Sequence, residues 1–201
     1  RGVNIVCVPE SHFDLDYFGT PGLKITPTLE GKDAKVEVEV YTTELREGEE
    51  LVYTLYDKDE NELYKIESRE NKAVFEIENV HLWHGRKDPY LYSATASIVS
   101  GDDVIDNVSS RFGCRSFKID PENGFILNGE EYPLRGVSRH QDRWGFGNAL
   151  LPEHHEEDIE LIMEVGATTI RLAHYHRALR CTIQCRNKRP HNDFAQGLQA
   201  Q

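Results

Sequence analysis

Hydrophobic and polar residues alternate with a period of two along much of the first half of the chain. Residues 34–41 are the clearest case, because Ala34, Val36, Val38 and Val40 occupy every second position and Lys or Glu stands between them. This alternation is typical of a β-strand with one buried face. Similar apolar runs follow, each separated from the next by turn-forming residues, at 51–56, 63–66, 73–77, 90–99 and 104–112.

About seven strands at this spacing, within residues 21–118, predict an immunoglobulin-like β-sandwich. Residues 1–20 differ in pattern, since a short apolar run precedes a stretch interrupted by Pro and Gly. We expect residues 1–20 to be the end of a preceding domain and a linker. The chain also begins within strand-like sequence and without a signal-peptide pattern, so we expect it to be part of a longer protein.

The pattern changes near residue 118. Asn128-Gly129 lies between two apolar runs and predicts a tight hairpin. A short strand over 134–138 precedes a helix that begins near Pro152 and ends at Gly166, and a second strand follows over 168–173. Strand, helix and strand in this order predict one unit of a parallel sheet. One such unit cannot cover both faces of its strands, so we expect it to be the start of a larger domain.

Composition and charge narrow the classes of partner. The chain is 38% hydrophobic and 29% charged, with a formal net charge of −12, which argues against nucleic acid as a partner. No apolar run is long enough to span a membrane. The charge is uneven, because residues 1–164 sum to −17 and residues 165–201 sum to +5. This change in charge after residue 164 predicts a domain boundary, an interaction tail or a segment that does not belong to the original protein.

Residues 176–201 have no sustained helical or strand period. We interpret this basic segment as non-native sequence, and a native basic interaction tail is the alternative. A metal site from Cys181, Cys185 and His191 is a third option, but their spacing is a poor zinc signature. The other two cysteines, Cys7 and Cys114, do not form the paired framework of a small secreted domain.

Polar and ionisable residues gather directly after both predicted parallel strands. They are Arg139, His140, Asp142 and Arg143 after the first strand, and Arg171, His174 and Tyr175 at and after the second. In a β/α barrel the active site lies at the carboxyl ends of the strands, so this placement predicts a site. The alternative is that these residues belong to solvated loops.

Other aromatic and ionisable residues favour structural roles. Trp83, Tyr90 and Tyr92 could form a platform on which a sugar ring stacks, but aromatic residues at such positions in a sandwich more often pack in its core. The histidine pairs His81/His84 and His154/His155 could suggest metal ligands. We expect all four to be solvated, the second pair at the acidic start of the helix.

Several motifs occur in the order found in one enzyme family. They are Leu82-Trp83, Asp88-Pro-Tyr-Leu-Tyr92, Arg111-Phe-Gly-Cys-Arg115, Asn128-Gly129, residues 134–142 and residues 158–175. In these motifs the chain resembles glycoside hydrolase family 2, most closely its β-galactosidases. The glucuronidases and mannosidases of the family share the layout.

The resemblance implies a jelly-roll sugar-binding domain that ends within residues 1–20, the sandwich over 21–118 and the start of a (β/α)8 catalytic barrel over 119–175. It implies retaining hydrolysis of terminal β-galactosides. His140 and His174 match histidines that line the sugar subsite, and Arg171 matches the arginine beside the second histidine. Asp142 is a fourth, weaker candidate for substrate binding.

The same resemblance implies that both catalytic residues are glutamates on later barrel strands. The sequence has no glutamate after Glu164, so we expect both to be absent from this chain and the chain alone to be inactive. The alternative is a non-catalytic immunoglobulin-like module that binds carbohydrate or protein. No cofactor is expected in this stretch, and a divalent cation stays open for the full-length enzyme. The expected partners are a β-galactoside or related glycoside and the remaining domains of the enzyme, and homo-oligomerisation stays open. The family members it resembles are bacterial, so the bacterial cytoplasm or periplasm is the expected compartment.

Overall fold

The computed structural model describes residues 5–17 and 20–172. They divide into two compact units. Among these residues, the sandwich unit comprises 5–17, 20–83 and Tyr90–Ser116, and the strand–helix unit comprises His84–Pro89 and 117–172. The predicted tail over 176–201, with its cysteine and histidine candidates, lies outside the described residues. No helix among the described residues is long and apolar enough to cross a membrane.

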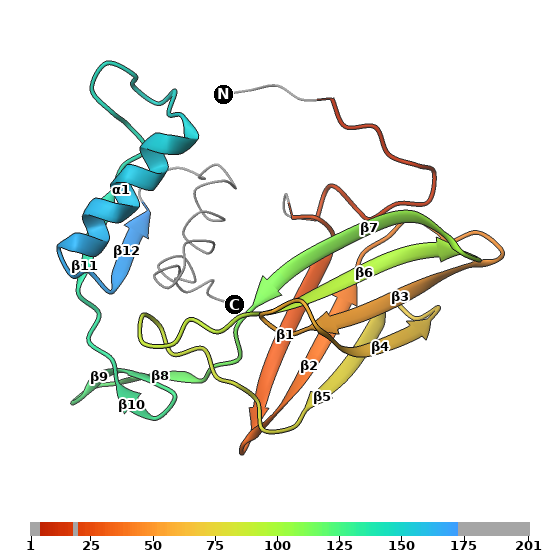
Figure 1. The fold of residues 1–201 in the computed structure, drawn as a ribbon, viewed down its shortest axis with the longest axis horizontal. Coiled ribbons are helices and arrows are strands. Elements are labelled where there is room, and N and C mark those ends of the chain that lie inside the picture. Colours follow the sequence, from red (N-terminus) through yellow and green to blue (C-terminus); the bar gives the residue numbers. More distant parts are fainter. Residues whose placement is uncertain (1–4, 18–19, 173–201) are drawn as a thin grey trace. The chain divides into compact units, whose positions relative to one another are not determined.

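The sandwich unit contains seven strands in two antiparallel sheets (Figure 1). One sheet has the order β1-β2-β5, and the other has the order β4-β3-β6-β7. The bounds are β1 Leu23–Glu30, β2 Asp33–Val40, β3 Glu49–Tyr56, β4 Glu62–Ser68, β5 Lys72–Ile77, β6 Tyr92–Ser100 and β7 Asp103–Phe112. The predicted immunoglobulin-like sandwich is confirmed.

The sandwich core follows from the alternation in the sequence. In β2, Ala34, Val36, Val38 and Val40 are buried while the residues between them are partly exposed. The same alternation places every second residue of β5 and β6 in one hydrophobic cluster with β3. Burial of this apolar surface is the main favourable contribution to folding.

The aromatic residues singled out in the sequence belong to this core. Trp83 and Tyr92 are buried, and Tyr90 packs against the cluster. Gly113 lies directly on Trp83, because a Cβ at residue 113 would come within 2.7 Å of the Trp83 Cβ. These rings therefore stabilise the sandwich and do not form an exposed sugar platform.

The N-terminal segment also contributes to the sandwich core. Phe13 is buried within the hydrophobic cluster and forms an isolated bridge with Thr42. The backbone N–H of Asp14 donates to the Tyr41 carbonyl at 2.8 Å. At least part of the segment that we expected to act as a linker is thus an integral part of the sandwich unit.

The strand–helix unit contains two small sheets and one helix. A three-stranded antiparallel sheet has the order β10-β9-β8, and a parallel pair consists of β11 and β12. The bounds are β8 Phe117–Asp120, β9 Gly124–Leu127, β10 Glu130–Glu131, β11 Gly136–Arg139, α1 Pro152–Glu164 and β12 Thr169–Leu172. Asn128 and Gly129 both have positive φ, at 52° and 84°, as the predicted tight hairpin requires.

Helix α1 begins and ends at the predicted signals. Pro152 is its first residue, and Gly166 follows its end with a φ of 79°. Ile159, Ile162 and Met163 on the helix pack with Val137 of β11 and Ile170 of β12. This small cluster joins the helix to the parallel pair and fixes the strand–helix–strand arrangement.

Candidate functional site

The parallel pair of β11 and β12 brings two candidate segments to the same edge. Ser138 lies opposite Arg171 and Arg139 lies opposite Leu172 in the register. Gly136 allows the strands to approach, because a Cβ there would come within 2.5 Å of Thr169 Cγ2. Since the two strands run in the same direction, their last residues, Arg139 and Leu172, lie at one edge of the sheet.

The face on which each strand residue lies follows from the cluster around α1. Val137 and Ile170 are opposite one another and pack against the helix. Ser138 and Arg171, one residue further along each strand, therefore lie on the face directed away from the helix. Arg171 is exposed there. In a closed barrel this face would be directed to the interior, and substrate binds at the carboxyl-terminal end of that interior.

Two further predicted site residues, His140 and Asp142, lie in the loop after β11. His140 directly follows β11 and is exposed, and Asp142 is exposed two residues later. His140 comes two residues after Ser138, and Ser138 is paired with Arg171 in the register of the two strands. The structure thus brings His140 and Arg171 to adjacent strand ends. His174 and Tyr175 lie outside the described residues.

Arg139 does not belong to the exposed group in which the sequence placed it. It is the last residue of β11, and its side chain is only 5% exposed. Its Nε and Nη2 donate to Asp158 Oδ2 at 2.8 and 2.5 Å, and Nη2 also lies 2.9 Å from His155 Nδ1. Both partners are residues of α1. Arg139 therefore connects the end of β11 with the helix.

The prediction of solvated histidines at the helix start is wrong for both residues. His154 is 9% exposed and His155 is 4% exposed. His154 Nδ1 accepts a hydrogen bond of 3.2 Å from the Leu151 N–H, and its ring packs edge-on against Phe146. The neighbouring glutamates suggested a solvated surface. One face of α1 nevertheless carries residues at helical spacing, namely His155, Asp158, Ile159 and Ile162. That spacing is the signal by which the buried residues could have been found.

The loop after Asp142 forms a tight turn that is fastened to the same helix. Arg143 and Gly147 form an isolated antiparallel β-bridge. The Arg143 N–H donates to the Gly147 carbonyl at 3.1 Å, and the Gly147 N–H donates to the Arg143 carbonyl at 2.9 Å. Arg143 Nη1 donates to Glu157 Oε2 at 2.5 Å. This hydrogen bond and the positive charge of Arg143 lower the pKa of the Glu157 carboxyl. Trp144 at the tip of the turn is 98% exposed.

The described residues contain no group of three or more His, Cys, Asp or Glu side chains arranged to hold a metal ion. The sugar-binding candidates are instead donors and acceptors of hydrogen bonds. Imidazole and guanidinium groups at strand ends suit the hydroxyls of a sugar, and such contacts assist catalysis where they strengthen in the transition state.

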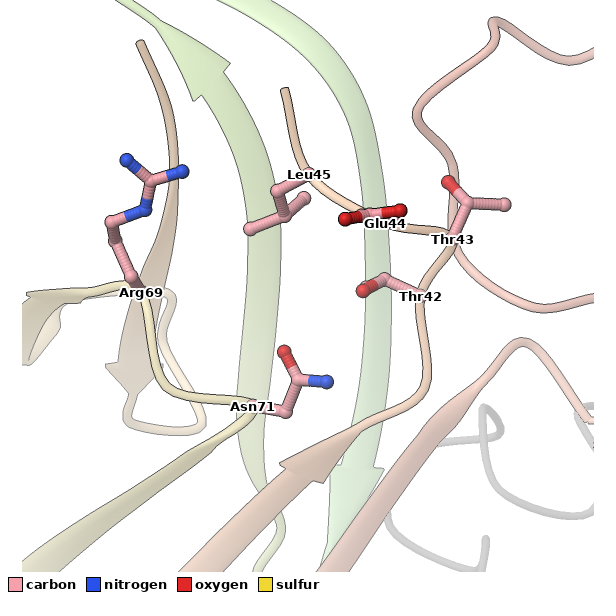
Figure 2. Close-up of a pocket in the computed structure, with 6 residues that line it drawn as sticks. All are labelled: Thr42, Thr43, Glu44, Leu45, Arg69 and Asn71. Carbon is pink, nitrogen blue, oxygen red and sulfur yellow. The ribbon is translucent and has the colours of Figure 1, made fainter. Parts of the chain in front are cut away.

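The sandwich unit has an open polar hollow of about 280 Å³ (Figure 2). Its lining comes from the loop after β2 and from the turn between β4 and β5, and consists of Thr42, Thr43, Glu44, Leu45, Arg69 and Asn71. Several of these groups already hold the loops together. Thr43 Oγ1 bonds the backbone of His12, and Arg69 Nη2 donates to the Arg46 carbonyl at 3.2 Å. The hollow is therefore a weaker candidate than the strand ends.

Comparison with known proteins identifies relatives of both units. A family model described as "Glycosyl hydrolases family 2" matches residues 21–115. A second, described as "Glycosyl hydrolases family 2, TIM barrel domain", matches residues 118–186. Together the two matches cover most of the chain, and the second confirms that the strand–helix–strand segment is the start of a barrel.

Individual relatives are glycosidases of two specificities. A β-glucuronidase of Bacteroides fragilis is 48% identical over 102 residues, which are 51% of this chain and 15% of that protein. A β-galactosidase of Thermoanaerobacter pseudethanolicus is 27% identical over 193 residues, which are 92% of this chain and 25% of that protein.

The fold has a counterpart in a solved structure. The crystal structure of an FMN-binding β-glucuronidase from Facaelibacterium prausnitzii L2-6 matches with a TM-score of 0.84 and 35% identity. The match covers 89% of this chain and 28% of that chain. The chain thus spans about a quarter, or less, of the length of the relatives that it matches.

Proposed function

We propose, since this chain belongs to glycosyl hydrolase family 2, that it forms the sandwich and the first part of the barrel of a retaining β-glycosidase. In this proposal the carboxyl ends of β11 and β12 supply one side of the sugar-binding site. His140 and Arg171 donate hydrogen bonds to sugar hydroxyls there, with His174 and Asp142 as further contacts.

The observation that supports this proposal is the parallel register of β11 and β12. It brings Arg171 and His140 to adjacent strand ends, on the edge where barrel enzymes bind substrate. The face of the pair that carries Arg171 is exposed, while the opposite face is covered by α1. Arg171 and His140 are therefore not part of the small core around Ile159.

The hydrolytic step needs groups that this chain does not supply. Retention requires two carboxyl groups about 5–5.5 Å apart, one as nucleophile and one as acid and base. The glutamates of the barrel segment before β12 lie on β10 or α1 or in the turns before them, and none follows Glu164. We infer that this chain binds one side of the sugar and that later strands of the same enzyme carry out bond cleavage.

Two sugars are candidates for the substrate. The motifs in the sequence resemble those of the β-galactosidases most closely, which makes a terminal β-galactoside the first candidate. The 48% identity to a β-glucuronidase over half of the chain favours a terminal β-glucuronide as the second candidate. The two differ at C6, where the glucuronide has a carboxylate, so charge at the site decides between them.

The test uses 4-nitrophenyl β-galactoside and 4-nitrophenyl β-glucuronide with two protein samples. The purified chain is expected to release no nitrophenol above a buffer blank, and the intact enzyme that contains it is expected to hydrolyse one of the two. His140→Ala in the intact enzyme should lower kcat/KM by about tenfold or more, because a contact to the transition state is lost. His81→Ala, on the sandwich, is the matched control. Turnover by the chain alone, or an unchanged kcat/KM in His140→Ala, would contradict the proposal.

A further inference from the structure

Arg139 carries a buried charge at the end of β11, one residue before His140. Its side chain is 5% exposed, and the described contacts of its guanidinium are with α1. A buried arginine is tolerated only where its charge and its N–H donors find partners. Asp158 supplies the negative charge, and His155 Nδ1 accepts a further hydrogen bond at 2.9 Å.

The hydrogen bond to His155 defines which nitrogen of the His155 ring carries the proton. Arginine can only donate, so His155 Nδ1 must be without a proton in this arrangement, and His155 is neutral with its proton on Nε2. His155 and Asp158 are three residues apart and lie on the same face of the helix. The guanidinium therefore meets two side chains of one helical turn, which fixes it in direction as well as in position.

A second set of contacts fastens the other end of the segment that contains the candidate site residues. Arg143 is paired with Glu157 at 2.5 Å, and the Phe146 ring lies against His154, with ring centroids 4.5 Å apart. His140 and Asp142 thus stand between two arginines, each held by a carboxylate of α1. The N-terminal half of this helix acts as the support of the loop.

From these contacts we propose that Arg139 is a positioning residue for His140, acting through Asp158 and His155 on α1. The proposal rests on the sugar-binding role of His140 given above. The backbone of Arg139 is paired with β12, and its side chain is locked onto α1, so the residue that follows leaves the strand from a fixed point. Without the contacts of Arg139 to α1, His140 samples orientations in which it does not contact the sugar. A misplacement of about 1 Å can cost about 10²-fold in rate.

The test removes the ion pair as a unit. Arg139→Met combined with Asp158→Leu replaces both charges by apolar side chains, a change that buried ion pairs often tolerate without loss of stability. Arg139→Met alone would leave Asp158 unpaired and is therefore less informative. Lys24→Met with Glu39→Leu, which removes an exposed ion pair of 2.6 Å in the sandwich unit, is the matched control.

In the intact enzyme, the Arg139/Asp158 double variant is expected to stay folded and to lose about tenfold in kcat/KM, and the control pair is expected to lose none. Adding His140→Ala to the double variant should cause little further loss, because Arg139 acts through His140. Fully additive losses, or wild-type kcat/KM in the double variant, would overturn the proposal.

A measurement on the present chain separates this proposal from the proposed function. In ¹⁵N NMR spectra, His155 should show an unprotonated Nδ1, and the His140 ring signals should move to averaged positions in the double variant. His140 signals that are identical in both proteins would overturn the positioning role. A His140→Ala enzyme with full activity would instead refute the sugar-binding role, and the spectra alone would then decide whether Arg139 positions the loop.

Discussion

Arg86 Nη1 donates a hydrogen bond of 3.0 Å to the carbonyl of Ala167, 81 residues further along the chain. Arg86 belongs to the loop His84–Pro89, which is part of the strand–helix unit, and Ala167 lies two residues before β12. In the same loop, Gly85 lies against the Tyr132 ring, and Lys87 forms an exposed ion pair with Glu130. The loop therefore supports the start of the strand that contains Arg171.

The first prediction concerns this support. Arg86→Met should lower the stability of the β12 segment by about 1 kcal/mol, because a hydrogen bond from a charged donor is lost at a partly exposed place. Amide hydrogen exchange of peptides from residues 167–172 should become faster. Lys87→Met is the control, since its exposed ion pair with Glu130 is worth little. Equal exchange in both variants would mean that the Arg86 contact does not stabilise β12.

The second prediction concerns the segment before the first strand. Phe13 is 2% exposed in the sandwich core, and its N–H donates to Asp106 Oδ2 at 2.9 Å. Phe13→Ala should destabilise the sandwich by about 3–5 kcal/mol, as for other buried Phe side chains. Ile5→Ala, at a side chain that is 92% exposed, should change stability by less than about 0.5 kcal/mol. Urea unfolding followed by circular dichroism measures both, and a small effect at Phe13 would show that residues 5–17 do not support the core.

The features that could be predicted from the sequence are those with a local signal. The alternating valines of residues 34–40 predict β2, and Asn128-Gly129 predicts the hairpin between β9 and β10. Pro152 and Gly166 mark the two ends of α1 to within two residues. In each case the preference of the backbone at those residues agrees with the final fold, so a short stretch of sequence was sufficient.

The features that escaped prediction depend on partners distant in the chain. Arg139 looks like a loop residue until Asp158 and His155 lie beside it, and Arg86 has no local sign of its contact with Ala167. Phe13 sits among polar and turn-forming residues, so nothing nearby marks it as part of the core. The candidate site was proposed from the sequence because polar residues follow two strands, and it stays a prediction. The contacts that hold it were missed because they are tertiary contacts.

The third prediction concerns cysteine reactivity. Cys7 is exposed, whereas Cys114 is buried, and burial raises the pKa of the Cys114 thiol to about 12. Because the thiolate is the reactive form, iodoacetamide at pH 8 should modify Cys7 in the folded protein and leave Cys114 unmodified. In urea both should react. Mass mapping of the peptides locates the label, and labelling of Cys114 at the rate of Cys7 in the native protein would contradict its burial.

The last prediction follows from the same burial and concerns alkaline pH. Burial raises the pKa of Tyr92 and of Cys114, each to about 12, and it also raises the pKa of the Tyr53 hydroxyl. These groups lose their protons more readily in the unfolded chain, where a thiol has a pKa of about 8.5 and a phenol about 10. The free energy of unfolding should therefore be unaffected by them below about pH 8.5 and should fall between about pH 8.5 and 12, by about 1.4 kcal/mol for each pH unit and group involved.

Urea unfolding at a series of pH values from 7 to 12 measures this slope for the sandwich unit. Cys114→Ala removes one titrating group from the core, so its stability should fall less steeply with pH than that of the unchanged chain, even if its absolute stability at pH 7 is lower. Cys7→Ala is the matched control, because it removes a thiol that is exposed and lies outside the core. Parallel curves for all three proteins would mean that the Cys114 thiol titrates alike in the folded and unfolded states, and that its burial is not what limits stability at high pH.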